Sequence, residues 1–247
     1  MRKHLSVFAL CIRTRLFRLL LLILAAAALS AAVFLALGLP RAWGDGFGPG
    51  LTVLWILFVA ANLTTCLLCI GPGTKRSKTV CLLQRLQISE RAFLLWDALT
   101  STACFLLLYA AQILIVFALA LLYQKSAAYS LGPQGVFLML ARNSFLHGLL
   151  PFGEPAAWAR NLLNLPCAGL SCAAAASALR NDRRAAAAAF SLVWMNARLP
   201  VRLGSGALSC IWLFAVAISA AIAFGGAYLS AHNGTRRQED EPDPQTP

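Results

Sequence analysis

Charged residues are scarce in this chain of 247 residues. They make up 12% of it, whereas a typical soluble domain has roughly 25%, and apolar residues make up 60%. Acidic residues are the rarest, since nine Asp and Glu stand against 21 Lys and Arg, for a net charge of +12. So little charge excludes an ordinary soluble domain and indicates a protein of the lipid bilayer.

The motifs of catalysis are also missing. The sequence has no HExxH, no GxSxG and no phosphate-binding loop. His4, His147 and His232 belong to three separate polar regions, and the CxxC of Cys66 and Cys69 has no second CxxC or His pair to complete a zinc site. We therefore expect no catalytic residue, no cofactor and no metal site.

Cysteine does not form a disulfide framework either. Six of the eight cysteines lie inside apolar runs, where Cys behaves as a small hydrophobic residue: Cys66, Cys69, Cys104, Cys167, Cys172 and Cys210. The basic residues, in turn, sit in short clusters between apolar runs. That pattern is typical of signals that orient membrane helices, and it argues against a nucleic-acid surface.

Long uncharged runs dominate what is present. They predict an all-α polytopic membrane protein with about six transmembrane helices in a domain at 19–231. The predicted spans are residues 19–39, 51–70, 92–123, 161–179, 185–197 and 206–230. The run 185–197 is short: it is either a thin, tilted crossing or does not cross, which would leave five spans.

Three further stretches frame these spans. Residues 1–18 alternate basic and apolar side chains, which favours an interfacial amphipathic lead whose arginines reach lipid phosphate, or else a loose basic leader. Residues 135–150 contain Arg142, whose burial unpaired at mid-bilayer would cost about 2.5–3.5 kcal/mol. We expect this stretch to be interfacial or partly re-entrant on the outer face. Residues 232–247 are acidic and Pro-rich, which predicts a disordered tail.

The basic residues predict an orientation. With six spans, fifteen of the 21 Lys and Arg fall on the side of the N-terminus and six on the other side. This bias places both termini in the cytoplasm of a multi-pass protein of the cytoplasmic membrane, with a bacterial cell as the expected host.

Polar residues inside the spans are candidates for function or for structure. Asp97 lies near the start of the third span, where Arg91 or Arg85 would be its partner; a proton relay would need a second buried acid, which no other span contains. Gln112, together with Asn62, Thr64, Thr65 and Asn164, would hydrogen-bond between helices or line a path. The outer segment with Arg142, His147, Glu154 and Trp158 would be an external gate or an interfacial helix.

The segment 74–97, TKRSKTVCLLQRLQISERAFLLWD, is the one long basic interruption. Val80, Leu83 and Leu86 recur at three-residue spacing, which predicts a short amphipathic helix. Ser89 is a good N-cap for the next helix, and Ile88 and Phe93 flank it as a hydrophobic staple. Two helices therefore meet there at a defined corner.

This corner resembles one in the ABC-2 type permeases, the membrane subunits of ATP-binding-cassette transporters. The resemblance covers residues 1–125 and rests on the basic lead, the LxxLxIS pattern and the long third span. It implies that 74–91 holds a coupling helix between spans two and three that docks on a separate ATPase subunit. The candidate contacts are Arg76, Lys78, Arg85, Leu86, Ile88 and Arg91.

The leading hypothesis is thus a permease-like subunit of an ABC transporter, which hydrolyses nothing itself and works as a homo- or heterodimer of membrane subunits. In that family the outer re-entrant hairpin lies between spans five and six, whereas the longest outer segment here is 124–157, between spans three and four. The alternative is a non-transporting membrane scaffold or regulatory subunit, which suits an acid-poor interior equally well.

Overall fold

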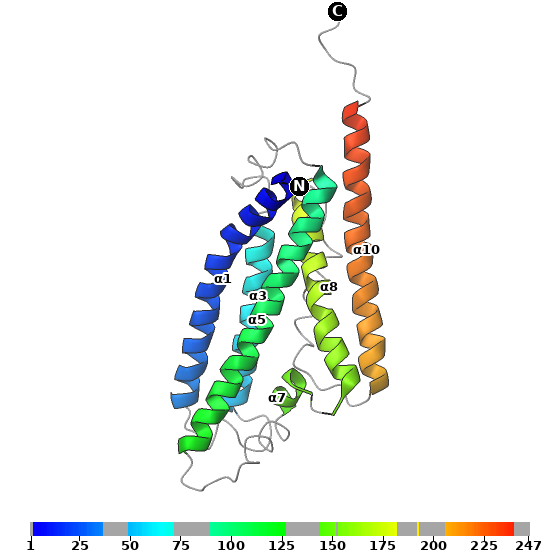
Figure 1. Cartoon of the computed structure of the whole chain (residues 1–247). Helices are drawn as coiled ribbons and strands as arrows, with labels where there is room; N and C mark the ends of the chain where they lie inside the picture. Colours follow the sequence, from blue (N-terminus) through cyan, green and yellow to red (C-terminus); the bar gives the residue numbers. More distant parts are fainter. Residues whose placement is uncertain are drawn as a thin grey trace, which may run out of the picture.

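The fold is a bundle of long helices, seen in a computed structural model that describes residues 2–36, 49–71, 89–126, 144–151, 153–181, 192 and 206–239. The long helices lie side by side, and no strand occurs in these ranges (Figure 1). The elements are α1 (Arg2–Ala36), α3 (Pro49–Ile70), α5 (Glu90–Ser126), the short α7 (Ser144–Leu149), α8 (Pro155–Arg180) and α10 (Gly206–Glu239).

Five of these helices are long and apolar enough to cross a membrane. Their candidate spans are Arg15–Ala36, Val53–Ile70, Glu90–Leu122, Pro155–Arg180 and Cys210–Ala231. The chain is therefore an all-α polytopic membrane protein, as predicted, and five of the six expected spans have a counterpart. The expected span 185–197 lies outside the described residues except for Leu192, which is 5% exposed and packs in the main core cluster.

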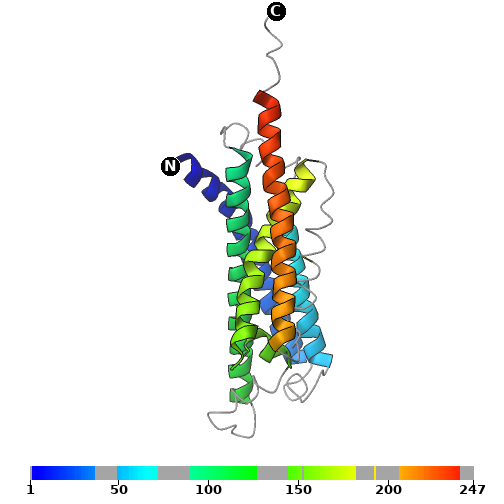
Figure 2. The same ribbon diagram turned by 90° about the vertical axis from the view of Figure 1, so that its right-hand side faces the viewer.

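Two helix boundaries differ from the expectation. Helix α1 runs unbroken from Arg2 to Ala36, so the expected lead and first span belong to one helix, whose first turns lie at an angle to the rest (Figure 2). The reason is local: no Gly or Pro interrupts these 35 residues, which extend over about 52 Å. Likewise, α10 continues past Ala231 to Glu239, into the expected tail.

Helix α8 is the central element of the bundle. Over an apolar 18-residue stretch of each helix, 67% of the residues of α8 are buried, against 22% for α1 and 17% for α10. It packs between α5 and α10 and also contacts α3, and its buried face is rich in small residues, Ala173 to Ala176 among them. Small side chains let the neighbouring backbones approach, which is how helices associate in lipid.

The helix directions divide the bundle into two ends. Helices α1 and α5 run downward in Figure 1, whereas α3, α8 and α10 run upward. The upper end therefore holds the start of α1, Ile70, Glu90, Arg180 and the end of α10. Figure 2 shows the same arrangement after a quarter turn, with the N-terminus and the end of α10 both toward the top. Helices α8 and α10 are thus parallel neighbours.

A close approach between α5 and α8 predicts a sharp sequence requirement. A Cβ added at Gly169 would come within 2.7 Å of the Thr102 backbone nitrogen and 2.9 Å of its Cα, whereas one added at Gly225 in α10 would meet nothing within 4 Å. Gly169→Ala should lower the thermal midpoint of the purified protein, because backbone must move to admit the methyl group.

Gly225→Ala is the matched control, since it adds the same methyl group to a helix. It should leave the midpoint unchanged or raise it, because Ala is favoured over Gly in a helix by about 1 kcal/mol. Equal midpoints for the two variants in the same detergent would contradict this packing.

Candidate functional site

The expected docking residues fall mostly outside the structure's description. Arg76, Lys78, Arg85, Leu86 and Ile88 belong to residues 72–88, which are not among those described. Arg91 is described, on the first turn of α5, with its guanidinium carbon 5.4 Å from the centre of the Tyr228 ring of α10. It therefore has a packing role in the bundle.

The main polar site lies near the upper end, where α1, α3 and α5 meet. Arg15 of α1 and Asp97 of α5 form an ion pair, and their exposed fractions are 2% and 0%. Asp97 is the one acidic residue that is fully buried among the described positions. Two opposite charges are thus enclosed in the bundle.

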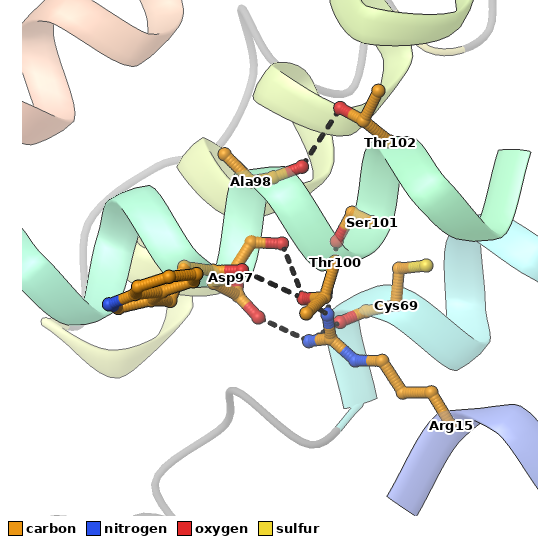
Figure 3. Close-up of polar contacts among 8 residues, drawn as sticks. Arg15, Cys69, Asp97, Ala98, Thr100, Ser101 and Thr102 are labelled. Atoms are coloured by element: carbon orange, nitrogen blue, oxygen red, sulfur yellow. Dashed lines mark hydrogen bonds and ion pairs between the residues drawn. The ribbon is translucent and has the colours of Figure 1, made fainter. Parts of the chain in front are cut away.

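The Arg15 guanidinium is held by several acceptors (Figure 3). Its Nη2 donates to the Asp97 carboxylate and to the carbonyl oxygen of Cys69 at 2.7 Å. Its Nη1 donates to the hydroxyls of Thr100 and Ser101, at 3.0 and 3.1 Å. One arginine therefore joins three helices, and these bonds compensate part of the cost of removing two charges from water.

The acceptors follow from the helical repeat of α5. Asp97, Thr100, Ser101 and Cys104 recur at the spacing of one helix face, so they form a polar stripe. The Thr100 hydroxyl donates to the carbonyls of Trp96 and Asp97, at 2.9 and 3.0 Å, which leaves its lone pairs to the guanidinium. The sequence alone shows this polar stripe, but it does not show that Arg15 of α1 is its partner.

The structure gives Asp97 a partner that the sequence analysis does not name. That partner is Arg15, 82 positions earlier in the chain, and not Arg91, while Arg85 lies outside the described residues. Arg91 precedes Asp97 by six positions, which puts the two on different faces of α5, and Arg91 lies over Tyr228. Arg15 had been assigned to an interfacial lead with arginines directed at lipid phosphate, whereas it is buried.

Three polar residues of α3 form hydrogen bonds within their own helix. Asn62, Thr64 and Thr65 donate to carbonyls one turn earlier in their own helix, at 2.9, 2.7 and 2.9 Å. Short polar side chains in an apolar helix satisfy themselves in this way. Gln112 is buried in α5, with 6% exposed, about one turn beyond Tyr109.

Polar contacts also join helix ends at the upper end. The Arg180 guanidinium lies 4.5 Å from the centre of the Phe93 ring, and the Asn181 side chain donates to Glu90 at 3.4 Å. These contacts and the pairing of Arg91 with Tyr228 connect α5 to α8 and to α10. The start of α5 is thus fixed by both neighbours.

A second buried polar cluster lies toward the lower end. The Tyr109 hydroxyl donates to the carbonyl of Leu149 at 2.7 Å, and the Asn161 amide donates to the carbonyl of Gly148 at 2.8 Å. Arg160 donates to the side-chain oxygen of Asn161 at 3.3 Å. These bonds attach the end of α7 to α5 and α8.

The outer segment is described only in part. Its His147 lies 3.5 Å from Glu154, measured from Nε2 to Oε1. His147 is buried, whereas Glu154 is partly exposed at the start of α8. Arg142 lies outside the described residues.

A lateral cavity of about 220 Å³ lies between α1 and α5, beside the ion pair. Its walls are apolar apart from Arg15, Thr100 and Cys104, and the full lining is Ile12, Arg15, Leu16, Leu19, Thr100, Ala103, Cys104 and Leu107. Leu16 and Leu107 are 40% and 39% exposed on the outer surface of these spans. The cavity therefore adjoins the lipid phase.

The described residues bring together no group of three or more His, Cys, Asp or Glu that could hold a metal ion. Comparison of the chain with protein-family models, curated proteins and solved structures gives no match. The functional reading therefore rests on the bundle, its buried ion pair and the basic segment at its upper end.

The buried pair predicts a non-additive mutational pattern. Arg15→Gln or Asp97→Asn alone should destabilise the protein by about 3–5 kcal/mol, because each leaves the other charge buried without its partner. The double variant should be more stable than either single one. Unfolding of the purified protein in detergent measures these differences as a double-mutant cycle.

Arg13→Gln is the matched control, since Arg13 is exposed on the same helix. It should change stability by no more than about 0.5 kcal/mol. Additive losses for the two single variants would show that the two charges do not depend on each other.

Proposed function

We propose that this chain is a permease-like membrane subunit of an ABC transporter, coupled to a separate ATPase subunit through the segment 74–91. The observation that carries the proposal is the position of that segment's anchors. Ile70 ends α3 and Glu90 begins α5 at the upper end of the bundle, the end that also holds the start of α1 (Figure 1). A basic, amphipathic stretch between those anchors suits contact with a partner at the membrane surface.

The charge of the two ends supports a cytoplasmic upper end. Arg13, Arg18, Arg91 and Arg180 belong to the upper parts of their helices, and the sequence adds basic residues at the start of α1 and near the end of α10. At the lower end of α8 there is Arg160, which is buried against Asn161. Basic residues concentrate on the cytoplasmic side of membrane proteins, so the docking segment would face the cytoplasm.

Helix directions support six crossings. The start of α1 and the end of α10 lie at the same end of the bundle, which requires an even number of crossings, whereas five span-length helices are described. In addition, α8 ends at the upper end and α10 begins at the lower end, while Leu192, between them in sequence, is buried in the core. The predicted span 185–197 would supply the return.

The start of α5 is suited to transmit movement. It is fixed to α8 and α10 by Arg180, Arg91 and Glu90, and about two turns further along Asp97 binds Arg15 of α1. A displacement of the 74–91 segment would therefore reach four helices through rigid contacts. ATP binding on the partner would then shift the bundle between two states.

A scaffold or regulatory subunit is the second candidate. It is favoured by one observation: the buried polar groups of the two clusters bind one another across helices, which suits a rigid bundle. The two candidates differ in whether an ATPase partner moves this subunit.

Docking predicts a charge-sensitive partner contact. Lys78→Glu with Arg85→Glu should abolish co-purification of an ATP-binding-cassette ATPase from native membranes, because the cations would meet acidic groups on that subunit. Arg91 is left unchanged, since its replacement would also disturb the packing on Tyr228.

Arg13→Glu is the matched control, a reversal of charge at an exposed position on α1. It should leave co-purification intact, and all variants should insert in the membrane to the same level. Normal recovery of the ATPase with the double variant would refute the docking assignment. Absence of any ATPase from the wild-type preparation would favour the scaffold.

The six-span arrangement makes a separate prediction. In sealed vesicles that expose the outer face, epitope tags at both termini should resist added protease. A protease site inserted at Gly153, in the turn between α7 and α8 at the lower end, should be cut. Cleavage of the C-terminal tag alone would indicate an odd number of crossings.

A further inference from the structure

The two cysteines of the CxxC in α3 each contact a thiol of another helix. The Cys69 side chain meets that of Cys104 in α5, and the Cys66 side chain meets that of Cys172 in α8, within the main core cluster. From the sequence alone, all four cysteines are expected to be packing residues. The fold assembles them into two inter-helical thiol pairs.

The two pairs differ in access. Cys104 is partly exposed and forms part of the wall of the lateral cavity between α1 and α5. Cys66 and Cys172 are 4% and 0% exposed and do not line that cavity. A reagent that enters the cavity therefore reaches the pair of Cys69 and Cys104 first.

The lining of the cavity determines which kind of reagent can enter it. Its lining is mainly aliphatic, with Leu19, Ala103 and Leu107 among the residues, and it adjoins the lipid phase. A small apolar ring dissolved in the bilayer suits such walls, whereas a charged or strongly hydrated molecule does not. The Arg15 guanidinium belongs to the same wall and is already paired with Asp97.

We propose that Cys69 and Cys104 form a membrane-embedded dithiol that a lipid-soluble quinone, entering through this cavity, oxidises to a disulfide. Both S–H bonds break and one S–S bond forms between the two sulfurs. The two electrons and two protons released pass to the quinone, which becomes the hydroquinone. The reaction needs no other oxidant and leaves the pair of Cys66 and Cys172 reduced.

The disulfide would link the upper end of α3 to α5 at a point about four turns from the start of α5. These helices flank the basic segment 74–91, and the backbone carbonyl of Cys69 already accepts a hydrogen bond from Arg15. Oxidation would therefore fix the relative position of the two anchors of that segment. This inference stands on the thiol contacts and the cavity, and it holds whether or not an ATPase docks there.

The test uses the full chain in isolated native membranes. The protein is reduced, the reductant is removed, and a short-chain ubiquinone analogue is added. Free thiols are then alkylated, and mass spectrometry of peptides identifies the linked cysteines. Cys69 and Cys104 should lose alkylation and appear as one linked peptide pair, while Cys66 and Cys172 stay alkylated.

Two sets of variants separate the role of the cavity from that of the thiols. Cys104→Ser should abolish the quinone-dependent link, whereas Cys172→Ser should leave it unchanged. Ala103→Phe, which fills the cavity, should slow linkage by the quinone but not by diamide, a small oxidant that needs no such cavity. Diamide linkage in that variant also shows that the bundle is folded with its sulfurs in contact.

Three results would overturn the proposal. One is equal oxidation of both pairs by the quinone, and another is diamide linkage of Cys69 to Cys104 with no linkage by the quinone. The third is no linkage by either oxidant in the wild-type protein, which would mean that the thiols do not meet. Recovery of an ATPase partner is a separate readout, so failure here leaves the proposed function untouched.

Discussion

The ion pair of Arg15 and Asp97 is the interaction on which the arrangement of the bundle depends. Apolar surface gives helices little reason to associate in lipid, because the acyl chains are as apolar as the side chains. A charge enclosed without its partner, by contrast, is costly. Helix α1, of which little is otherwise covered, is therefore fixed in position and in rotation by the need to deliver one guanidinium to the Asp97 carboxylate and the Cys69 carbonyl.

Helix α5 unites the two polar regions. Its upper part carries Asp97, Thr100 and Ser101 toward α1 and α3, and its lower part carries Tyr109 toward α7 and α8. Between and beside these regions, contact with α8 is made by small residues, closest where Gly169 meets Thr102. Polar bonds thus determine which helices meet, while small side chains determine how closely they pack. This division agrees with a membrane bundle whose interior contains little charge.

The sequence predicts the spans well because long apolar runs carry a strong signal, and five predicted runs match helices of the bundle. It does not predict which residues pair across helices. Asp97 was recognised as exceptional from its type and depth, but its partner was sought nearby in sequence. Arg15 was overlooked because a cluster of arginines next to an apolar run is the usual mark of a membrane surface. That rule concerns the average arginine of a cluster, and only three-dimensional contacts identify the one that turns inward. The thiol contacts of Cys66 and Cys69 likewise depend on which helices are neighbours, and the sequence does not show that.

The central position of α8 has a consequence for how the protein is made. Its buried face is rich in alanine, and α10, which follows α8 in the chain, covers part of that face, including Ala173 and Ala174. Synthesis proceeds from the N-terminus, so α8 enters the membrane before its cover exists. The newly inserted chain therefore leaves this small-residue face of α8 next to lipid until α10 arrives. Loss of α10 would accordingly leave the central helix of the bundle without one of its two main neighbours.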